Sequence, residues 1–151
     1  MEVYLVRHGE AKSEEEDASR PLTEKGRGEI RKVAVQLAKA GIKLNVVVHS
    51  DKLRAKQTAE IFANYLKPMN GVQEMLGLAP NDKTKIAEKF LEIATGSVML
   101  VGHLPHLSKL TALLVTGKQE SDIVAFGTGG VVCLTKQENW KIKWSITPEV
   151  I

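Results

Sequence analysis

Short apolar runs that alternate with segments of helical periodicity are the feature that most constrains the fold of this chain. Three runs, at residues 2–6, 44–50 and 97–103, have the length and β-branched content of buried strands. Between them, residues 23–41 and 52–67 place apolar side chains at the three-and-four spacing of amphipathic helices. Strands that alternate with helices form a mainly parallel sheet through right-handed crossovers. The sequence therefore predicts a three-layer α/β/α fold.

The rest of the chain extends this pattern. Residues 69–82 contain Gly71, Gly77 and Pro80, so we expect an irregular segment there. A helix is expected from about Lys83, with Ile86, Phe90 and Ile93 in the core, and another helix with Pro105 in its first turn. The stretches "GGVVCLTKQ" at residues 129–137 and "WKIKWSI" at residues 140–146 predict an antiparallel hairpin at one edge of the sheet.

Length and composition limit the possible classes of protein. A chain of 151 residues with 43% hydrophobic residues is expected to form a single domain over residues 1–151. The single cysteine, Cys133, excludes an internal disulfide. No apolar stretch approaches the roughly 20 residues of a membrane span, so we expect a cytoplasmic protein. The net charge of +3 is spread among interleaved lysines and glutamates, which argues against nucleic-acid binding.

Each of the three predicted strands ends at a histidine. Arg7 and His8 follow the first strand, His49 ends the second, and His103 ends the third. In open α/β sheets, ligands bind beyond the carboxyl ends of the parallel strands, where the loops diverge. We therefore expect these side chains to contribute to one site.

Three arginines lie near the same predicted edge and indicate an anionic ligand. They are Arg7, Arg20 in "SRPLT" and Arg54 in the first turn of the second helix. Guanidinium groups beside a helix N-terminus favour phosphate. Neighbouring positive charge also keeps a histidine neutral near pH 7, so that its lone pair can attack phosphorus. The arginines would stabilise the transferred phosphoryl group, and no divalent metal is required.

Four motifs resemble a known family. They are "RHG" after the first strand, "SDKLRAKQTAEI" opening the second helix, "GHLPHLS" after the third strand, and "SRPLTEKG" at residues 19–26. The first three resemble the histidine phosphatase superfamily, which has the phosphoglycerate-mutase-like fold. The fourth motif and the short length are similar to its small SixA-type branch of phosphohistidine phosphatases. The resemblance extends over essentially the whole chain.

The resemblance implies a mechanism and a set of site residues. His8 would be the nucleophile that becomes phosphorylated, and Arg7, Arg54 and His103 would complete the phosphate pocket. Arg20 would also contact phosphate. The enzyme would need no cofactor and would dephosphorylate phosphohistidine on a partner protein in signal transduction, for example a histidine phosphotransfer domain.

Some residues depart from the family pattern or lie outside it. Asp51 stands where the family usually has proline, and we expect its side chain to face solvent. His49 and His106 are outside the shared motifs and are expected to be peripheral. Glu74 in "VQEMLGLAP" is the one nearby candidate for a general acid. A phosphohistidine substrate makes the acid less necessary, because its leaving imidazole has a conjugate-acid pKa near about 6.5.

Several alternatives remain open at this point. The same chemistry would serve a phosphatase of small phosphomonoesters such as sugar phosphates. A metal-dependent hydrolase is disfavoured, because the arginines would repel a divalent cation. A non-catalytic phospho-protein binding module would have little use for the nucleophile His8. The sequence leaves the oligomeric state open.

Overall fold

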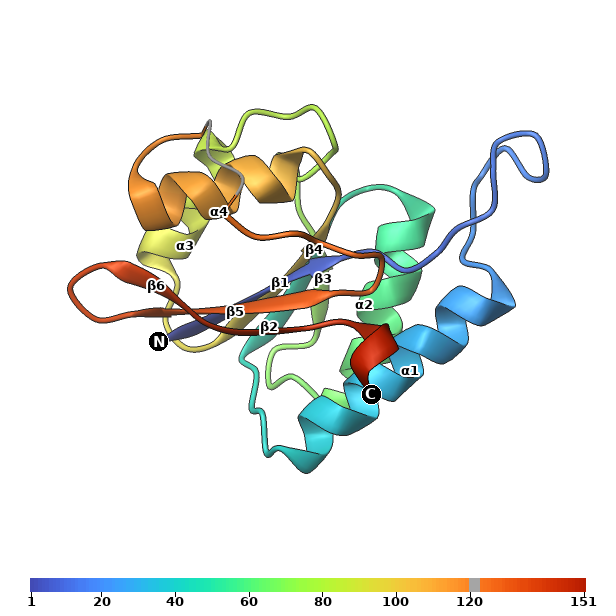
Figure 1. Cartoon of the computed structure of the whole chain (residues 1–151), viewed down its shortest axis with the longest axis horizontal. Coiled ribbons are helices and arrows are strands. Elements are labelled where there is room, and N and C mark those ends of the chain that lie inside the picture. Colours follow the sequence, from blue (N-terminus) through green and yellow to red (C-terminus); the bar gives the residue numbers. More distant parts are fainter. Residues whose placement is uncertain (120–122) are drawn as a thin grey trace.

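The computed structural model describes residues 1–119 and 123–151, and its centre is one six-stranded sheet (Figure 1). The strand order is β3-β2-β4-β1-β5-β6. Strands β1 to β4 are parallel, whereas β5 and β6 form an antiparallel hairpin beside β1. The strands are β1 (Glu2–Arg7), β2 (Val46–His49), β3 (Val72–Glu74), β4 (Val98–Gly102), β5 (Val131–Lys136) and β6 (Trp140–Ile146).

Helices cover both faces of this sheet. One face packs against α1 (Glu24–Lys39) and α2 (Leu53–Leu66), and the other against α3 (Lys85–Ile93) and α4 (His106–Thr116) (Figure 1). Successive strand residues point to opposite faces, so Tyr4 and Val6 join the first core while Val3 and Leu5 join the second. A short 3-10 helix, η1 (Pro148–Val150), follows β6. The predicted three-layer fold with its edge hairpin is confirmed.

Helix α1 begins against the segment that follows β1. The Thr23 hydroxyl accepts a hydrogen bond from the Gly26 N–H at 2.9 Å, which caps the helix N-terminus. The same hydroxyl donates to the Glu10 carboxylate at 2.7 Å. A Cβ atom at Gly26 would lie 2.3 Å from the Glu10 carbonyl oxygen. Only glycine therefore allows α1 to approach the backbone just beyond His8 this closely.

The expectation of an irregular segment at 69–82 was wrong in part. Residues Val72–Glu74 form the parallel edge strand β3, which pairs with β2. Three residues flanked by Gly71 and Gly77 carry too little of a period-two pattern to be recognised in the sequence. This strand forms only because β2 offers it a hydrogen-bonding partner.

The residues expected in the core from the third helix were wrong in part, because Phe90 packs against the core whereas Ile86 and Ile93 are exposed. In α3 the side chains of Ala87 and Leu91 are buried, whereas Ile86 is 53% exposed and Ile93 is 80% exposed. Both sets of residues have helical spacing, so periodicity alone could not choose between the two faces. Pro105, expected inside the first turn of the next helix, is instead the N-cap residue of α4. None of the helices in the described ranges is both long enough and apolar enough to cross a membrane.

Candidate active site

The carboxyl ends of three adjacent strands meet at one edge of the sheet. Strand β4 lies between β1 and β2. In the pairing register, Arg7 lies opposite Gly102, and His49 lies opposite Val101. The ladder continues past β1, where the N–H of His8 donates to the carbonyl of Gly102 at 3.0 Å. The sheet order thus brings together strand ends that are distant in sequence, as predicted.

His8 and His103 form the centre of this edge. Their ring centroids are 5.0 Å apart, with an angle of 53° between the ring planes. The Nδ1 atom of His8 lies 2.7 Å from the carbonyl oxygen of Gly9. A carbonyl can only accept, so this contact places the proton of a neutral His8 on Nδ1. The lone pair of His8 is therefore on Nε2, where it is available to a reacting atom.

His103 is held from the neighbouring strand. Its side chain is 1% exposed, and its Nε2 atom lies 2.6 Å from the hydroxyl oxygen of Ser50. That hydroxyl oxygen also accepts from the N–H of Lys52 at 3.3 Å. The Nδ1 atom of His103 is buried and has no hydrogen-bond partner in the described part of the chain. Ser50 therefore fixes the ring of His103 beside His8.

Both imidazoles are neutral at pH 7. The pKa of His8 is lowered to about 4, mainly by burial and then by the positive charges of Arg54, Arg7 and Arg20, against the opposing effect of the Gly9 carbonyl. The pKa of His103 falls to about 3, first through burial and then through repulsion between its protonated form and the neighbouring His8 and Arg54 groups. The sequence predicted this direction from the arginines alone. Burial is the larger cause in both cases.

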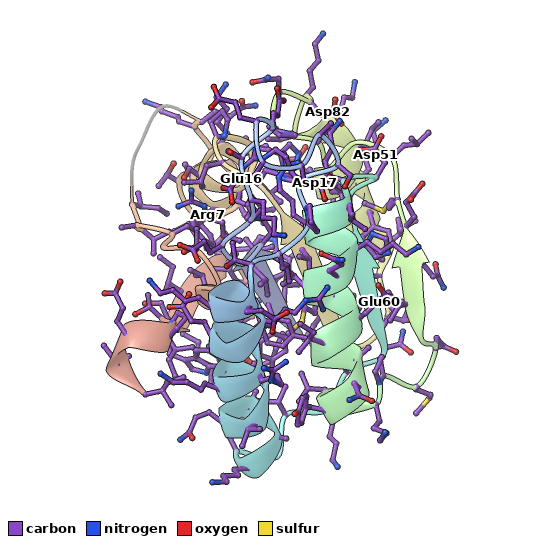
Figure 2. All side chains as sticks on the ribbon, turned by 90° about the vertical axis from the view of Figure 1, so that its right-hand side faces the viewer. Arg7, Glu16, Asp17, Asp51, Glu60 and Asp82 are labelled. Atoms are coloured by element: carbon purple, nitrogen blue, oxygen red, sulfur yellow. The ribbon has the colours of Figure 1, made fainter. Side chains whose placement is uncertain are left out.

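Two arginines contribute buried donors to the same edge. Arg7 Nη1 donates to the carbonyl of Phe126 at 2.8 Å, which orients the guanidinium. The Nε atoms of Arg7 and Arg54 are buried and have no acceptor among residues 1–119 and 123–151. Figure 2 shows Arg7 toward the same end of α1 and α2 as Asp51, which precedes α2. A surplus of buried cationic donors over acceptors suits an anion such as phosphate.

Arg20 belongs to the loop between β1 and α1. Its backbone has a left-handed φ of 49°, and its Nε donates to the carbonyl of Lys12 at 2.9 Å. Its charge lowers the pKa values of both His8 and Arg54, which places it among the electrostatic neighbours of the site. The loop therefore brings a third positive charge near the predicted phosphate position.

Other candidates lie apart from this cluster. Glu74 is exposed on the edge strand β3, with β2 and β4 between it and β1. Three strand spacings of about 4.8 Å put it roughly 14 Å across the sheet from β1. Asp51 is exposed and faces Lys52 at 3.9 Å. His49 bonds the carbonyl of Ser50, and His106 is buried in the first turn of α4, so neither joins the pair of facing imidazoles.

Two side chains of α2 form hydrogen bonds with the segment between β1 and α1, and the sequence did not predict these contacts. The Thr58 hydroxyl accepts from the N–H of Gly9 at 3.1 Å and donates to the carbonyl of Arg54 at 2.8 Å. The Gln57 side-chain oxygen accepts from the N–H of Leu22 at 2.8 Å. Both residues belong to the motif "RAKQTAE", but nothing in their spacing shows which loop they contact.

The donor set does not resemble a metal centre. Within residues 1–119 and 123–151, no three His, Cys, Asp or Glu side chains are grouped so that they could hold an ion. The cluster combines two neutral imidazoles with guanidinium groups. Its chemistry is the binding of an anion beside a nitrogen nucleophile.

Comparison with known proteins agrees with this chemistry. The family model of the histidine phosphatase superfamily (branch 1) matches residues 3–79. The phosphohistidine phosphatase SixA of Escherichia coli (strain K12) is 29% identical over 98% of this chain and 94% of its own length. An uncharacterised protein of Picosynechococcus sp. is 36% identical over 78% of this chain and 75% of its own length.

A solved structure extends the likeness to three dimensions. The protein histidine phosphatase SixA complexed with tungstate superposes with a TM-score of 0.88 and is 29% identical, covering 99% of each chain. The sequence motifs and the whole fold therefore indicate the same family. The chain belongs to the histidine phosphatase superfamily and is a phosphatase homologous to SixA over its whole length.

Proposed function

We propose that this phosphatase removes the phosphoryl group from phosphohistidine on a partner protein, through a phosphorylated His8 intermediate and without a metal. The observation that carries the proposal is the contact of His8 Nδ1 with the Gly9 carbonyl. This contact leaves the Nε2 lone pair free, and the lowered pKa keeps it unprotonated at neutral pH. The whole-chain similarity to SixA supports the choice of phosphohistidine.

The first chemical step transfers the phosphoryl group to His8. The Nε2 lone pair attacks phosphorus, a new N–P bond forms, and the N–P bond of the substrate breaks. Its electron pair returns to the substrate ring, which leaves as neutral imidazole because its other nitrogen already carries a proton. Arg7, Arg54 and Arg20 bind the phosphoryl oxygens, and His103 lies beside them. Guanidinium groups that meet the charge of the transition state lower the barrier.

The second step regenerates the enzyme. Water attacks phosphorus, the N–P bond to His8 breaks, and inorganic phosphate leaves while Nε2 recovers its lone pair. The leaving imidazole of the first step has a conjugate-acid pKa near about 6.5, so it departs without a strong acid. We therefore assign no proton transfer to Glu74, and expect Glu74→Gln to retain turnover of phosphohistidine.

A protein substrate is compatible with the site because no additional subdomain covers it. The connections from α2 to β3 and from β3 to α3 are residues 67–71 and 75–84, and within the described residues no inserted subdomain rises over the carboxyl edge of the sheet (Figure 1). An open edge admits a side chain presented by another protein. A small metabolite would gain little enclosure there.

Trapping the intermediate tests the role of His8. After acid-free quenching of a reaction with a phosphohistidine protein carrying labelled phosphate, we expect label on the enzyme that is lost on acid treatment. His8→Asn should carry none and should lose at least about a thousandfold in kcat, because the covalent route is closed. His49→Asn, a buried histidine outside the cluster, is the matched control. Equal labelling of His8→Asn would overturn the proposal.

A substrate comparison tests the rest of the proposal. We expect kcat/KM for a phosphohistidine protein to exceed that for a panel of sugar phosphates and other small phosphomonoesters, with activity persisting in excess chelator. Faster turnover of the small esters would show that the substrate is a small phosphomonoester, whereas the proposed mechanism would stand. Binding of the phosphoprotein without turnover would instead indicate a binding module.

A further inference from the structure

An apolar groove lies directly beside the candidate active site. It is formed where the start of α4 faces the segment that precedes β5, and its volume is about 490 Å³. We call it the Leu104–Phe126 groove; it is lined by Leu104, Ser108, Ile123, Val124, Ala125 and Phe126. This volume is within the range of ligand pockets, about 300–1,000 Å³.

Both walls of the groove are joined to residues of the phosphate site. On one wall, Leu104 directly follows His103 in the chain. On the other, the carbonyl of Phe126 accepts the hydrogen bond from Arg7 Nη1 at 2.8 Å. The groove is therefore adjacent to the site, within reach of residues that neighbour a phosphohistidine bound there.

The lining has the opposite chemical character to the phosphate site. Five of its six residues are apolar, Ser108 is the one polar residue among them, and none carries a charge. The phosphate site next to it presents Arg7, Arg20 and Arg54. A ligand that fills both regions must combine an anionic group with an apolar one.

The walls of the groove pack against the hydrophobic core on their inner side. Phe126 is buried in the core between the sheet and α3 and α4, and Leu104 and Val124 pack against that core. Ser108 and Ile123 are half-buried, and Ala125 is exposed at the rim. The groove is therefore preformed, and filling it requires no rearrangement of the fold.

We propose that the Leu104–Phe126 groove is a specificity subsite that receives an apolar side chain lying next to the phosphohistidine of the protein substrate. This proposal rests on the proposed function, and it specifies the substrate class: a protein segment in which phosphohistidine has an aliphatic or aromatic neighbour. A sugar phosphate has only hydroxyl groups beside its phosphate and cannot fill an apolar groove favourably.

Paired substrates test the groove. Phosphohistidine peptides would differ only at the residues flanking the phosphohistidine, with Leu in one peptide and Asn in its partner. Burial of one aliphatic side chain predicts a kcat/KM about tenfold higher for the Leu peptide. The measured quantity is the ratio of the two kcat/KM values, so any general change in activity cancels.

Two variants connect the ratio to this groove. Ala125→Trp places a large ring on an exposed rim position, and Ser108→Phe fills the groove from α4. Each should bring the ratio close to one by excluding the Leu side chain. Asn64→Trp, an exposed position on α2 away from the groove, is the matched control and should keep the tenfold ratio.

The outcomes separate this proposal from the proposed function. Hydrolysis of both peptides at equal rates by the wild-type chain would overturn the groove proposal and leave the phosphohistidine phosphatase intact. Failure to hydrolyse either peptide would overturn the proposed function itself. A tenfold ratio that persists in Ala125→Trp and Ser108→Phe would place the apolar contact elsewhere and overturn the groove proposal. A change in oligomeric state in these variants would also overturn it, because the groove would then be a contact between copies of the chain.

Discussion

The adjacent cations Arg7 and His8 have different environments in the folded chain. Arg7 is fixed by the Phe126 carbonyl, whereas His8 turns its Nδ1 toward the carbonyl of Gly9. Burial, more than the neighbouring arginines, holds the pKa of His8 at about 4. The pair is therefore not two repelling charges, because only Arg7 is charged at neutral pH.

The contact between Ser50 and His103 leads to a prediction at the scale of single residues. Ser50→Ala removes the hydroxyl 2.6 Å from His103 Nε2 and leaves that buried nitrogen without a partner. Loss of one such hydrogen bond is worth about 1–1.5 kcal/mol, so we expect kcat to fall about tenfold. Nitrogen NMR of the His103 ring should also show a changed tautomer balance, which a purely structural role would not produce.

A matched serine provides the control for this variant. Ser145 is exposed on β6, so Ser145→Ala should leave both kcat and the His103 signals unchanged. If Ser50→Ala kept the wild-type kcat and ring signals, Ser50 would not position His103.

At the scale of elements, the close approach of α1 to the segment after β1 sets the position of the loop that follows His8. Gly26→Ala would place a methyl group 2.3 Å from the Glu10 carbonyl oxygen, so the helix or the loop must move. Overpacking of this kind costs about 1–3 kcal/mol of the free energy of unfolding. Urea unfolding followed by circular dichroism measures this change.

Gly28 on the same helix is the natural control. A Cβ atom there meets only the end of the Arg31 side chain, at 3.9 Å. Gly28→Ala should therefore be neutral or should stabilise the helix by up to about 1 kcal/mol, because alanine is the better helix former. Equal free energies of unfolding for the two variants would contradict the tight packing at Gly26.

At the scale of the whole molecule, the buried histidines link stability to pH. The pKa values of His8 and His103 are about 4 and about 3 in the folded chain, below the ordinary value of 6.5. The unfolded chain therefore binds more protons between these values, and stability must fall as pH falls through this window. The contribution is fully present above pH 6.5 and is lost progressively below it.

The slope of stability against pH measures this linkage. Between pH 5 and pH 6, replacement of His103 by Asn should remove up to about one proton from the number taken up on unfolding. His8→Asn should have a similar effect, since its pKa is lowered in the same direction. Urea midpoints at several pH values provide the slope. The same slope in the wild-type chain and in both variants would contradict the buried neutral state of the two rings.

Local patterns in the sequence determined most of the architecture and the position of the candidate site at the strand ends. Alternation of apolar strands with amphipathic helices depends on side-chain periods within a few residues, so it predicted the layers, the edge hairpin and the strand ends at His8, His49 and His103. The same reasoning failed where a pattern was short or ambiguous. It missed β3 and assigned Ile86 and Ile93 of α3 to the core.

The tertiary structure decided what depends on contacts between distant segments. It placed β4 between β1 and β2, and so brought His103 to His8. It also set the bonds from Gly9 to Thr58 and from Arg7 to Phe126, which join residues 49 and 119 positions apart. Such pairings carry no signature in the local sequence, because a side chain or a carbonyl gains its partner only after the sheet and helices have packed together.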